Sequence, residues 1–429
     1  MLDASALKRY ILEFHDRDLR GLRPRELKVD SIKGKATVIM GPRRSGKTYY
    51  LFTLMKEGRE RYLYLDLEHP IFYSLEPSDF PRILDSYKEL YPELSPVIML
   101  DEVQAVPEWE RMVRYAIDLG LETYVTGSSS KLLASEIASH LRGRSLSYIL
   151  LPLSFREYLT FKGIDFEGRE MYRNYHRIVA ALENFLKYGA YPEVALMEGE
   201  NLRMRILREY LDLVVRRDVL ERFRLRNRKL LNDLTLFALN SYSKHISYDS
   251  LYRLHKGRTK VTKRTVANYI SYLSEAFFLF TLSRYSPSIK ERIVAPRKIY
   301  LVDTGYGNFG AKSISRDMEN AVFLELYRRH VNDPTAELYY WKDGSGHEVD
   351  FVVVKEGRVR ELIQVAYSLE EEKTVSREIR SLLKAKKVLK CGDLKIITWK
   401  DEWERRLSWW GESGVVRAIP LWRWLLTPS

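Results

Sequence analysis

Cysteine, glutamine and long apolar runs are what this sequence lacks. Cys391 is the only cysteine among 429 residues, which excludes an internal disulfide bond and a metal site built from a cluster of cysteines. We interpret Cys391 as a small hydrophobic residue. No stretch approaches the roughly 18 to 20 uninterrupted apolar residues that cross a bilayer, and residues 1–20 mix charges throughout instead of showing the apolar core of a signal peptide. We expect a cytoplasmic protein without a membrane partner.

Composition places the chain among globular, multidomain proteins. The length predicts about three domains at roughly 150 residues each, and a hydrophobic content of 45% is sufficient for real cores. Gln104 and Gln364 are the only glutamines, whereas charged residues make up 30% of the chain. Scarce glutamine combined with abundant charge favours a thermophilic source.

Positive charge is concentrated in one region of the chain. The net charge is +13, yet residues 201–300 contain 22 Lys plus Arg against 8 Asp plus Glu and so carry +14, which leaves −1 for the other 329 residues. A localised basic region favours a polyanionic partner such as DNA, because each phosphate contact releases condensed counterions. A solvated basic helix surface is the alternative.

A glycine-containing loop follows the short β-branched and apolar run at residues 36–40, which predicts a strand. The loop has the spacing of a P-loop, in which backbone N–H groups cradle the β-phosphate and the following helix adds its dipole. Lys47 has the length and charge to reach the β and γ oxygens of ATP, and the Thr48 hydroxyl can bind magnesium. The predicted ATP-binding residues are Gly41, Pro42, Arg43, Arg44, Ser45, Gly46, Lys47 and Thr48.

An acidic pair, Asp101 and Glu102, ends a second apolar run at residues 97–100. A continuous apolar run of this kind predicts a buried parallel strand, and open α/β sheets bind ligands at the carboxyl ends of such strands. Asp101 is suited to hold magnesium through water together with Thr48, and Glu102 to orient and deprotonate the attacking water. Residues 62–66, between the two motifs, predict a further core strand.

A small polar loop and two arginines follow the acidic pair. Residues 123–127 predict a strand that leads into Ser128 and Ser129, and we predict that one of these hydroxyls senses the γ-phosphate. Arg142 and Arg144 are candidates for an arginine finger, which stabilises transition-state charge from the same chain or from a neighbouring subunit. Because the chain has so many arginines, a solvated surface position is an equal alternative for each of them.

These motifs together resemble a known family. The P-loop, Leu100-Asp-Glu-Val-Gln104, Thr126-Gly-Ser-Ser129, Gly143-Arg144 and Pro152-Leu-Ser-Phe-Arg-Glu-Tyr158 are similar to those of archaeal and bacterial AAA-type P-loop ATPases with a C-terminal PD-(D/E)XK nuclease-like domain. The resemblance continues through Tyr188-Gly-Ala-Tyr-Pro192, Tyr300-Leu-Val-Asp-Thr-Gly305, Glu319-Asn320 and Glu348-Val-Asp350. It covers most of the chain, in the expected order.

The resemblance implies an α/β fold in which a P-loop AAA-type core is followed by a helical lid, a winged helix-turn-helix and a restriction-endonuclease-like α/β domain. The corresponding boundaries are an N-terminal segment at 1–35, the ATPase core at 36–155, the lid at 156–227, the winged helix-turn-helix at 228–290 and the nuclease-like domain at 291–429. Apolar positions at helical spacing between residues 156 and 227 agree with the lid.

Three short amphipathic helices are predicted between residues 229 and 275. The third, near residues 262–273, has the basic character of a recognition helix that enters a DNA groove. Small helical domains also dock proteins, and the charge distribution favours DNA over that alternative. The predicted DNA-binding residues are Lys256, Arg258, Lys260, Lys263 and Arg264.

The nuclease-like domain departs from the pattern that the resemblance implies. A nuclease of this fold needs a glutamate on a helix, an aspartate on a strand, and then an acidic residue and a lysine two positions apart on the next strand. Glu319 and Asp350 match the first two positions, but Gln364 and Ala366 stand at the other two. A neutral amide is a poor ligand for a hard cation, and alanine carries no charge. We expect no metal-dependent cleavage.

We therefore predict an ATPase that uses ATP and Mg²⁺, acts on DNA through its basic winged-helix region and has a homo-oligomer as a candidate assembly. One alternative is a slow nucleotide switch that controls how the C-terminal domains engage DNA or a protein. Another is an ATP-driven nuclease for DNA junctions. Stimulation of turnover by DNA distinguishes the first two hypotheses, and a cleavage assay addresses the third.

Overall fold

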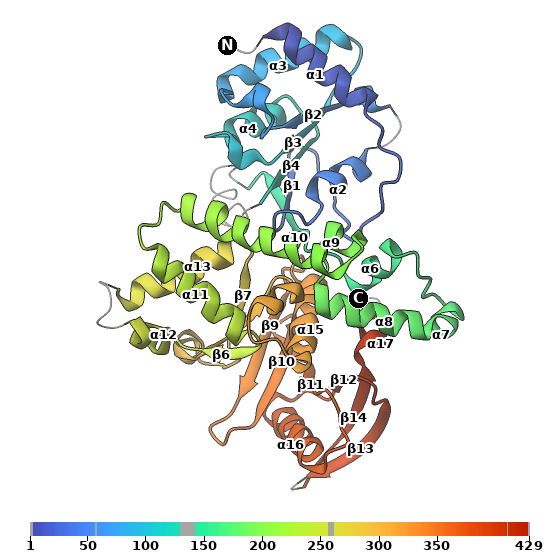
Figure 1. Ribbon diagram of the computed structural model, residues 1–429, viewed down its shortest axis with the longest axis vertical. Helices are drawn as coiled ribbons and strands as arrows, with labels where there is room; N and C mark the ends of the chain where they lie inside the picture. The colour runs from blue at the N-terminus through green and yellow to red at the C-terminus, as the bar shows by residue number, and fades with distance from the viewer. Residues whose placement is uncertain are drawn as a thin grey trace. The chain divides into compact units, whose positions relative to one another are not determined.

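The computed structural model divides the chain into two compact units, Met1–Leu151 and Pro152–Ser429 (Figure 1). It describes residues 3–55, 58–128, 141, 143–255, 261–409 and 411–427, with the backbone alone at 372–374. Within these ranges no helix is long and apolar enough to span a membrane.

The first unit is built on a parallel sheet of five strands in the order β2-β3-β4-β1-β5. Its strands are β1 (Ala36–Met40), β2 (Tyr62–Asp66), β3 (Val97–Asp101), β4 (Thr123–Gly127) and β5 (Ser145–Ile149). The apolar runs at 36–40 and 97–100 are buried throughout, as strands covered on both faces require. The strands expected at 36–40, 62–66, 97–100 and 123–127 are thereby confirmed.

Helices complete the first unit. They are α1 (Ala4–Asp16), α2 (Lys47–Leu54), α3 (Phe80–Leu90) and α4 (Glu110–Asp118), with short 3-10 turns at Arg59–Arg61, Pro70–Phe72, Pro77–Asp79 and Val103–Ala105. Helix α1 begins where the Asp3 carboxylate accepts hydrogen bonds from the N–H groups of Ser5 and Ala6, which satisfies two donors that the first turn leaves free. Its Phe14 ring stacks on Tyr64 of β2, with ring centroids 4.5 Å apart.

The second unit begins with helices. They are α6 (Phe155–Phe161), α7 (Glu170–Arg173), α8 (Tyr175–Tyr188), α9 (Pro192–Leu196) and α10 (Glu200–Leu213), which continues into a π-helical segment at Val214–Glu221. Helix α6 starts at a capping box, because the Ser154 hydroxyl accepts from the Glu157 N–H and the Glu157 carboxylate accepts from the Ser154 N–H. Residues 156–227 are therefore largely helical, as their apolar spacing predicts.

A small three-stranded antiparallel sheet follows, in the order β6-β8-β7. In chain order its elements are α11 (Arg228–Ser241), β6 (Lys244–Ile246), α12 (Tyr248–His255), α13 (Lys263–Glu275), β7 (Leu279–Leu282), α14 (Ile289–Val294) and β8 (Arg297–Leu301). The three helices expected between 229 and 275 are confirmed. Strand β8 lies beyond the boundary placed at residue 290, yet it is the central strand of this sheet.

The last part of the chain forms a mixed sheet of six strands in the order β13-β14-β12-β11-β10-β9. Strands β9, β10 and β11 are antiparallel neighbours, whereas β11, β12 and β14 run parallel. The elements are a 3-10 turn at Thr304–Phe309, α15 (Ile314–His330), β9 (Ala336–Lys342), β10 (Glu348–Lys355), β11 (Arg358–Val365), α16 (Glu372–Leu389), β12 (Leu394–Thr398), β13 (Trp403–Trp409), β14 (Glu412–Pro420) and α17 (Leu421–Leu426).

The two faces of this sheet pack against different helices. Alternate residues of a strand point to opposite faces, so Val352 and Val354 of β10 share a core with Leu382 and Leu383 of α16. Phe351, which points the other way, lies beside Phe323 of α15 with ring centroids 6.4 Å apart. The apolar run at 351–354 is therefore covered on both sides.

Two motifs from distant parts of the sequence meet at the buried carboxylate of Asp303. One Asp303 oxygen accepts a 2.7 Å hydrogen bond from the Ala190 N–H, and the other accepts a 2.8 Å bond from the Gly305 N–H. Gly189 precedes this contact with φ +79°, and a Cβ atom there would lie 1.6 Å from Asp303 Oδ1. Burial raises the pKa of Asp303 to about 6. Glycine is thus required at 189 for both space and backbone conformation.

We predict that Gly189→Ala strongly destabilises the second unit. The added methyl group must displace the Asp303 carboxylate, so two buried N–H groups lose their acceptor, and we expect a loss of about 3 kcal/mol or more in the free energy of unfolding. Gly199→Ala is the matched control, because Gly199 also has a positive φ, +86°, but has open space around its Cβ position. Chemical denaturation of the two variants measures the difference, and equal losses would contradict the steric argument.

Candidate functional site

The P-loop leaves the carboxyl end of β1 in a conformation that its glycines permit. Gly46 has φ +95°, and a Cβ atom at Gly41 would lie 2.0 Å from the carbonyl oxygen of Leu150. Arg25 holds the loop from outside, since its guanidinium donates to the carbonyl oxygens of Ser45 at 2.7 Å and Leu151 at 2.8 Å. The sequence reasoning missed Arg25, because nothing local connects it to the loop.

Lys47 is almost completely buried beneath the loop, with 3% of its surface exposed. Its ammonium group donates to the carbonyl oxygens of Gly41 at 3.3 Å and Pro42 at 3.1 Å, and it lies 3.3 Å from Glu102 Oε1. The lysine and the acidic pair were predicted to share one site from positions far apart in the sequence, and the sheet brings them together. Strands β1 and β3 are both parallel to β4, so their carboxyl ends reach the same edge of the sheet.

Three hydroxyl groups hold the carboxylate of Asp101. Thr48 Oγ1 donates to Asp101 Oδ2 at 2.7 Å, the Tyr64 hydroxyl donates to the same oxygen at 2.9 Å, and the Thr126 hydroxyl donates to Oδ1. Burial, together with the neighbouring Glu102 charge, raises the pKa of Asp101. Thr48 and Asp101, the predicted magnesium residues, are thus in direct contact. Tyr64 and Thr126 are additions that only the register of neighbouring strands reveals.

Glu102 follows β3 in a left-handed conformation, φ +52°, that turns its side chain towards the loop. Its N–H donates to Thr126 Oγ1 at 3.0 Å, and its carboxylate accepts from the Gln104 amide and from Lys47. Burial alone would raise the pKa of Glu102, but the Lys47 charge and the Gln104 hydrogen bond lower it below its ordinary value. The group is therefore ionised and oriented.

Ser128, one of the two predicted sensors, is buried at the end of β4 and bonds to the Gln104 amide at 3.2 Å. Gln104 also donates to Glu102, so it connects Ser128 to the acidic pair. Ser129 lies outside the described residues. Arg142 also lies outside them. Arg144 precedes β5, and its carbonyl oxygen accepts from the Ala36 N–H at the start of β1. Strand β1 is five residues long, so Arg144 is more than about 10 Å from the P-loop edge.

The residues at this edge suit a nucleotide. Ser45 Oγ is fully buried and has no hydrogen-bond partner among the described residues, although an unpaired buried hydroxyl is costly. It lies in the loop whose N–H groups face a phosphate in every P-loop. Lys47 supplies a cation and Thr48 a hydroxyl beside the carboxylate of Asp101. The donor set therefore fits a triphosphate with its magnesium ion.

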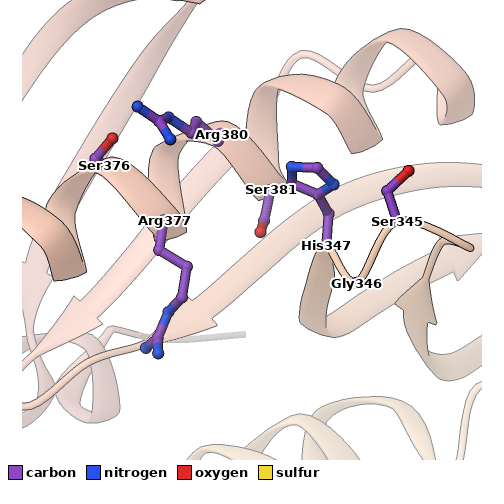
Figure 2. Close-up of a pocket in the computed structure, with 7 residues that line it drawn as sticks. All are labelled: Ser345, Gly346, His347, Ser376, Arg377, Arg380 and Ser381. Carbon is purple, nitrogen blue, oxygen red and sulfur yellow. The ribbon is translucent and has the colours of Figure 1, made fainter.

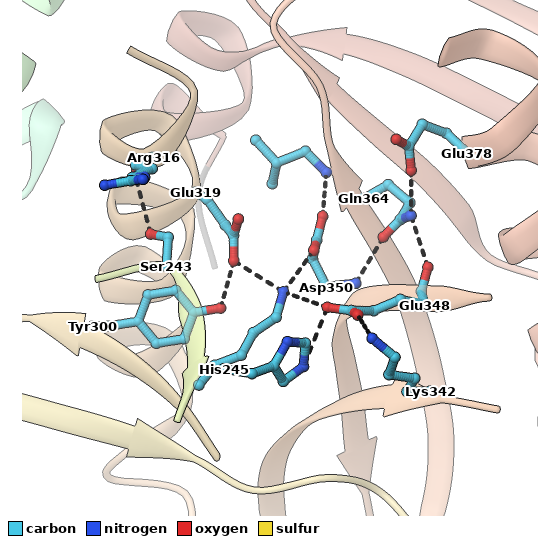
Figure 3. A network of polar contacts seen from close by, with 12 residues as sticks. Ser243, His245, Tyr300, Arg316, Glu319, Lys342, Glu348, Asp350, Gln364 and Glu378 are labelled. Atoms are coloured by element: carbon cyan, nitrogen blue, oxygen red, sulfur yellow. Dashed lines mark hydrogen bonds and ion pairs between the residues drawn. The ribbon is translucent and has the colours of Figure 1, made fainter. Parts of the chain in front are cut away.

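A second polar cluster lies in the second unit and includes Tyr300, Glu319, Glu348 and Asp350 (Figure 3). At its centre is the ammonium group of Lys298 on β8. Lys298 is buried, and its Nζ lies 3.1 Å from Glu319 Oε1, 3.0 Å from Glu348 Oε1 and 2.8 Å from Asp350 Oδ1. The Tyr300 hydroxyl donates to Glu319 at 2.8 Å. One lysine from the small sheet thus pairs with carboxylates on α15 and β10.

Lys298 is the residue of this cluster that sequence reasoning missed. Burial alone would lower its pKa, but Asp350 and Glu319 raise it well above the ordinary lysine value, so the ammonium stays charged. Burial raises the pKa of Glu319. Among the described residues, no group of three or more His, Cys, Asp or Glu side chains is arranged to hold a metal ion. The position between Glu319 and Asp350 is taken by a lysine.

Gln364 lies on β11 and Ala366 directly follows this strand. Both residues make contacts within the fold. The Gln364 side chain accepts from the Asp350 N–H at 2.7 Å, donates to the Glu348 carbonyl at 2.9 Å and donates to the Glu378 carboxylate (Figure 3). Ala366 belongs to the apolar core beneath α16. The lysine beside these carboxylates, Lys298, comes from β8, and the expected pattern does not include that strand.

The predicted DNA-binding residues are only partly described. Lys256, Arg258 and Lys260 lie outside the described residues. Lys263 and Arg264 are both exposed on the first turn of α13, and Lys263 forms an ion pair with Asp249 of α12. The opposite face of α13 is buried through Val266, Ile270 and Leu273 among others.

We predict that Lys298→Met destabilises the second unit by about 3–5 kcal/mol, because it removes a buried cation from three partly buried carboxylates while keeping most of the side-chain volume. Lys400→Met is the control, since Lys400 pairs with Glu370 on the surface and we expect no measurable change. The measurement is chemical denaturation at neutral pH. Asp350→Asn should partly restore stability in the Lys298→Met background, and an additive double variant would contradict the proposed pairing.

Comparison with family models assigns most of the chain. Residues 33–159 match an AAA domain, residues 179–313 match a domain of unknown function (DUF8612), and residues 316–421 match a second one (DUF4143). The AAA match contains the P-loop and both acidic residues. It supports the ATPase character of the first unit.

Two relatives and one solved structure extend the comparison. The uncharacterized protein MJ1544 of Methanocaldococcus jannaschii is 35% identical over 410 residues, which cover 94% of this chain and 91% of that protein. An uncharacterized protein of Haemophilus influenzae is 28% identical over 353 residues, 78% of this chain and 83% of its own. The Walker-type ATPase PABY2304 of Pyrococcus abyssi is 17% identical and covers 72% of this chain and 95% of its own, with a TM-score of 0.39. That score is too low to support a conclusion. From its identity and coverage with MJ1544 and its AAA-domain match, the chain belongs to the archaeal and bacterial family of AAA-type ATPases that includes MJ1544.

Proposed function

We propose that this protein binds ATP with magnesium at the P-loop, hydrolyses it, and couples hydrolysis to DNA binding by the basic region of its second unit. The convergence of Lys47, Thr48, Asp101 and Glu102 at one sheet edge supports this most directly. A cation, a metal-binding hydroxyl, a metal-binding carboxylate and a general base are the groups that phosphoryl transfer to water needs.

Each group has a distinct role in hydrolysis. Loop N–H groups and Lys47 bind the β and γ phosphates, and the lysine charge counters the negative charge that develops on the transferred phosphoryl group. Thr48 directly and Asp101 through water would hold the magnesium ion, which would supply positive charge to the phosphate groups. Glu102 accepts a proton from the attacking water. The water oxygen forms a bond to the γ-phosphorus, and the bond between that phosphorus and the bridging oxygen breaks, so that ADP leaves.

Two further groups complete the proposed site. Ser128 reaches Glu102 through Gln104, so a contact between Ser128 and the γ-phosphate can report the presence of ATP to the base. Arg144 stands at the far edge of the sheet, bonded to Asp118. Arg142 and Arg144 are the proposed candidates for an arginine finger. Because Arg144 lies far from the P-loop edge of its own chain, it could serve only at the site of a neighbouring subunit. A homo-oligomer would supply that geometry.

We predict that Lys47→Ala weakens nucleotide binding, whereas Glu102→Gln binds ATP normally and turns over at least about 100-fold more slowly. The lysine contacts ground-state phosphates, but the glutamate acts on the water alone. Fluorescent-nucleotide titration and phosphate release measure the two effects. Glu93→Gln, an exposed position of the same unit, is the control. Equal turnover in wild type and Glu102→Gln would exclude Glu102 as the base.

We further propose that α11, β6, α12, α13, β7 and β8 form a winged helix-turn-helix with α13 as its recognition helix. Their chain order and the antiparallel β6-β8-β7 sheet support this assignment. Helix α13 starts at the Thr262 cap and exposes Arg264 and Asn268 on the face opposite its apolar side. That face is free to enter a groove.

We predict that Arg264→Glu lowers the affinity for duplex DNA, because it removes a phosphate contact. The slope of binding against salt concentration should fall by an amount that corresponds to about one released counterion or more. Lys263 should contribute less, since Asp249 already pairs with it. Arg205→Glu is the control, because Arg205 is exposed in the same basic part of the sequence but lies on α10. Fluorescence anisotropy at several salt concentrations measures the slope. The same slope in Arg264→Glu and Arg205→Glu would assign the basic residues to a solvated surface.

The C-terminal domain is proposed to be a nuclease-like fold without cleavage activity. The order α15-β9-β10-β11-α16-β12 supports the fold, and the Lys298 ammonium between Glu319 and Asp350 supports the loss of metal-dependent chemistry. The junction-nuclease alternative requires cleavage by wild type that Asp350→Ala abolishes.

A slow nucleotide switch is the second candidate function. The lowered pKa of Glu102 makes it a weaker base, which favours slow turnover. ATP hydrolysis that DNA does not stimulate would favour the switch over a motor.

A further inference from the structure

A cavity of about 480 Å³ lies between α16 and the turn that joins β9 to β10 (Figure 2). Its described lining consists mainly of cationic and hydroxyl side chains, with no carboxylate among them. From the turn come Ser345, Gly346 and His347, and from α16 come Ser376, Arg377, Arg380 and Ser381. None of its described lining residues contacts Lys298.

Arg380 is the cation of this cavity with the fewest partners. It is exposed and forms no ion pair with any described residue, and its guanidinium lies over the Trp409 ring, 5.8 Å from the ring centroid. This contact fixes the plane of the guanidinium while leaving its N–H groups free to donate. Arg380 is therefore oriented but electrostatically uncompensated.

The acidic groups near the cavity are already neutralised. Asp343 pairs with Lys384 at 2.5 Å and with His347 at 3.3 Å, and Glu378 pairs with Arg377 at 2.5 Å. Because His347 Nδ1 faces Asp343, Nε2 is the ring nitrogen left for a ligand. Among the described side chains that line the cavity, Arg380 is thus the cation without an ion-pair partner.

We propose that this cavity binds a phosphodiester group of a nucleic acid backbone. Guanidinium groups bind phosphate through paired N–H donors, and serine hydroxyls add neutral donors that tolerate any base sequence. The cavity exceeds the size of one phosphate, and its open form suits a continuous strand. This inference rests on the proposed DNA binding and assigns the nuclease-like domain a role in holding the backbone.

The carboxylates beneath the cavity do not oppose this role. Gln364 links Asp350 to Glu378, and Glu378 in turn pairs with Arg377 at the cavity wall. The Lys298 ammonium balances part of the charge of Glu319, Glu348 and Asp350. A phosphate above them therefore meets arginines first.

Binding of labelled duplex DNA to the full chain tests the proposal without added nucleotide. We expect Arg380→Gln to weaken binding about tenfold, the loss of one charge-assisted hydrogen bond, and Arg380→Lys to weaken it less. Arg406→Gln is the matched control, an exposed arginine on β13 of the same domain, and should bind as wild type. Thermal unfolding verifies that each variant is folded. Wild-type affinity in Arg380→Gln would overturn the proposal.

Two further arms separate this site from others. If Arg264→Glu has no effect but Arg380→Gln does, the recognition-helix assignment fails and the cavity stands; the reverse result overturns the cavity. Inorganic phosphate titrated against tryptophan fluorescence tests for free phosphate as the ligand. A signal lost in Arg380→Gln, with DNA affinity unchanged, would assign the cavity to free phosphate and contradict the nucleic acid proposal.

Discussion

The buried ammonium group of Lys298 is the interaction on which the second unit most depends. It extends from the small sheet on β8 and meets Glu319 on α15 and Asp350 on β10, so a single cation joins three segments of the chain. Partly buried carboxylates this close together would otherwise repel one another or take up protons. Taking away this lysine leaves charges without compensation, which costs far more than an exposed ion pair is worth.

The first unit depends on a different constraint, the common direction of its strands. Parallel strands end at one edge of the sheet, and that edge collects Lys47 and Thr48 from the loop after β1 with Asp101 and Glu102 from the end of β3. Hydroxyl groups of neighbouring strands then orient the carboxylates. The position of the site is therefore set by the main-chain hydrogen bonding that aligns the strands.

The C-terminal mixed sheet combines a buried lysine with an exposed arginine. Lys298 lies among the carboxylates of Glu319, Glu348 and Asp350, while Gln364 and Ala366 make structural contacts. Arg380, beside Trp409, nevertheless keeps an uncompensated charge at the surface. Binding of a polyanion at such a surface requires positive charge and hydrogen-bond donors but no bound metal.

The sequence by itself determined those features that depend on a few neighbouring residues. The P-loop, the strand before it, the acidic pair at 101 and 102 and the basic helix α13 follow from spacing and periodicity over a few residues. Only the tertiary structure decided the rest. Lys298 reaches Glu319 from another sheet, Asp303 meets Gly189 across more than 100 residues, and Arg380 faces a turn far from it in sequence. Such contacts depend on which strands become neighbours, and no local pattern along the chain specifies that pairing.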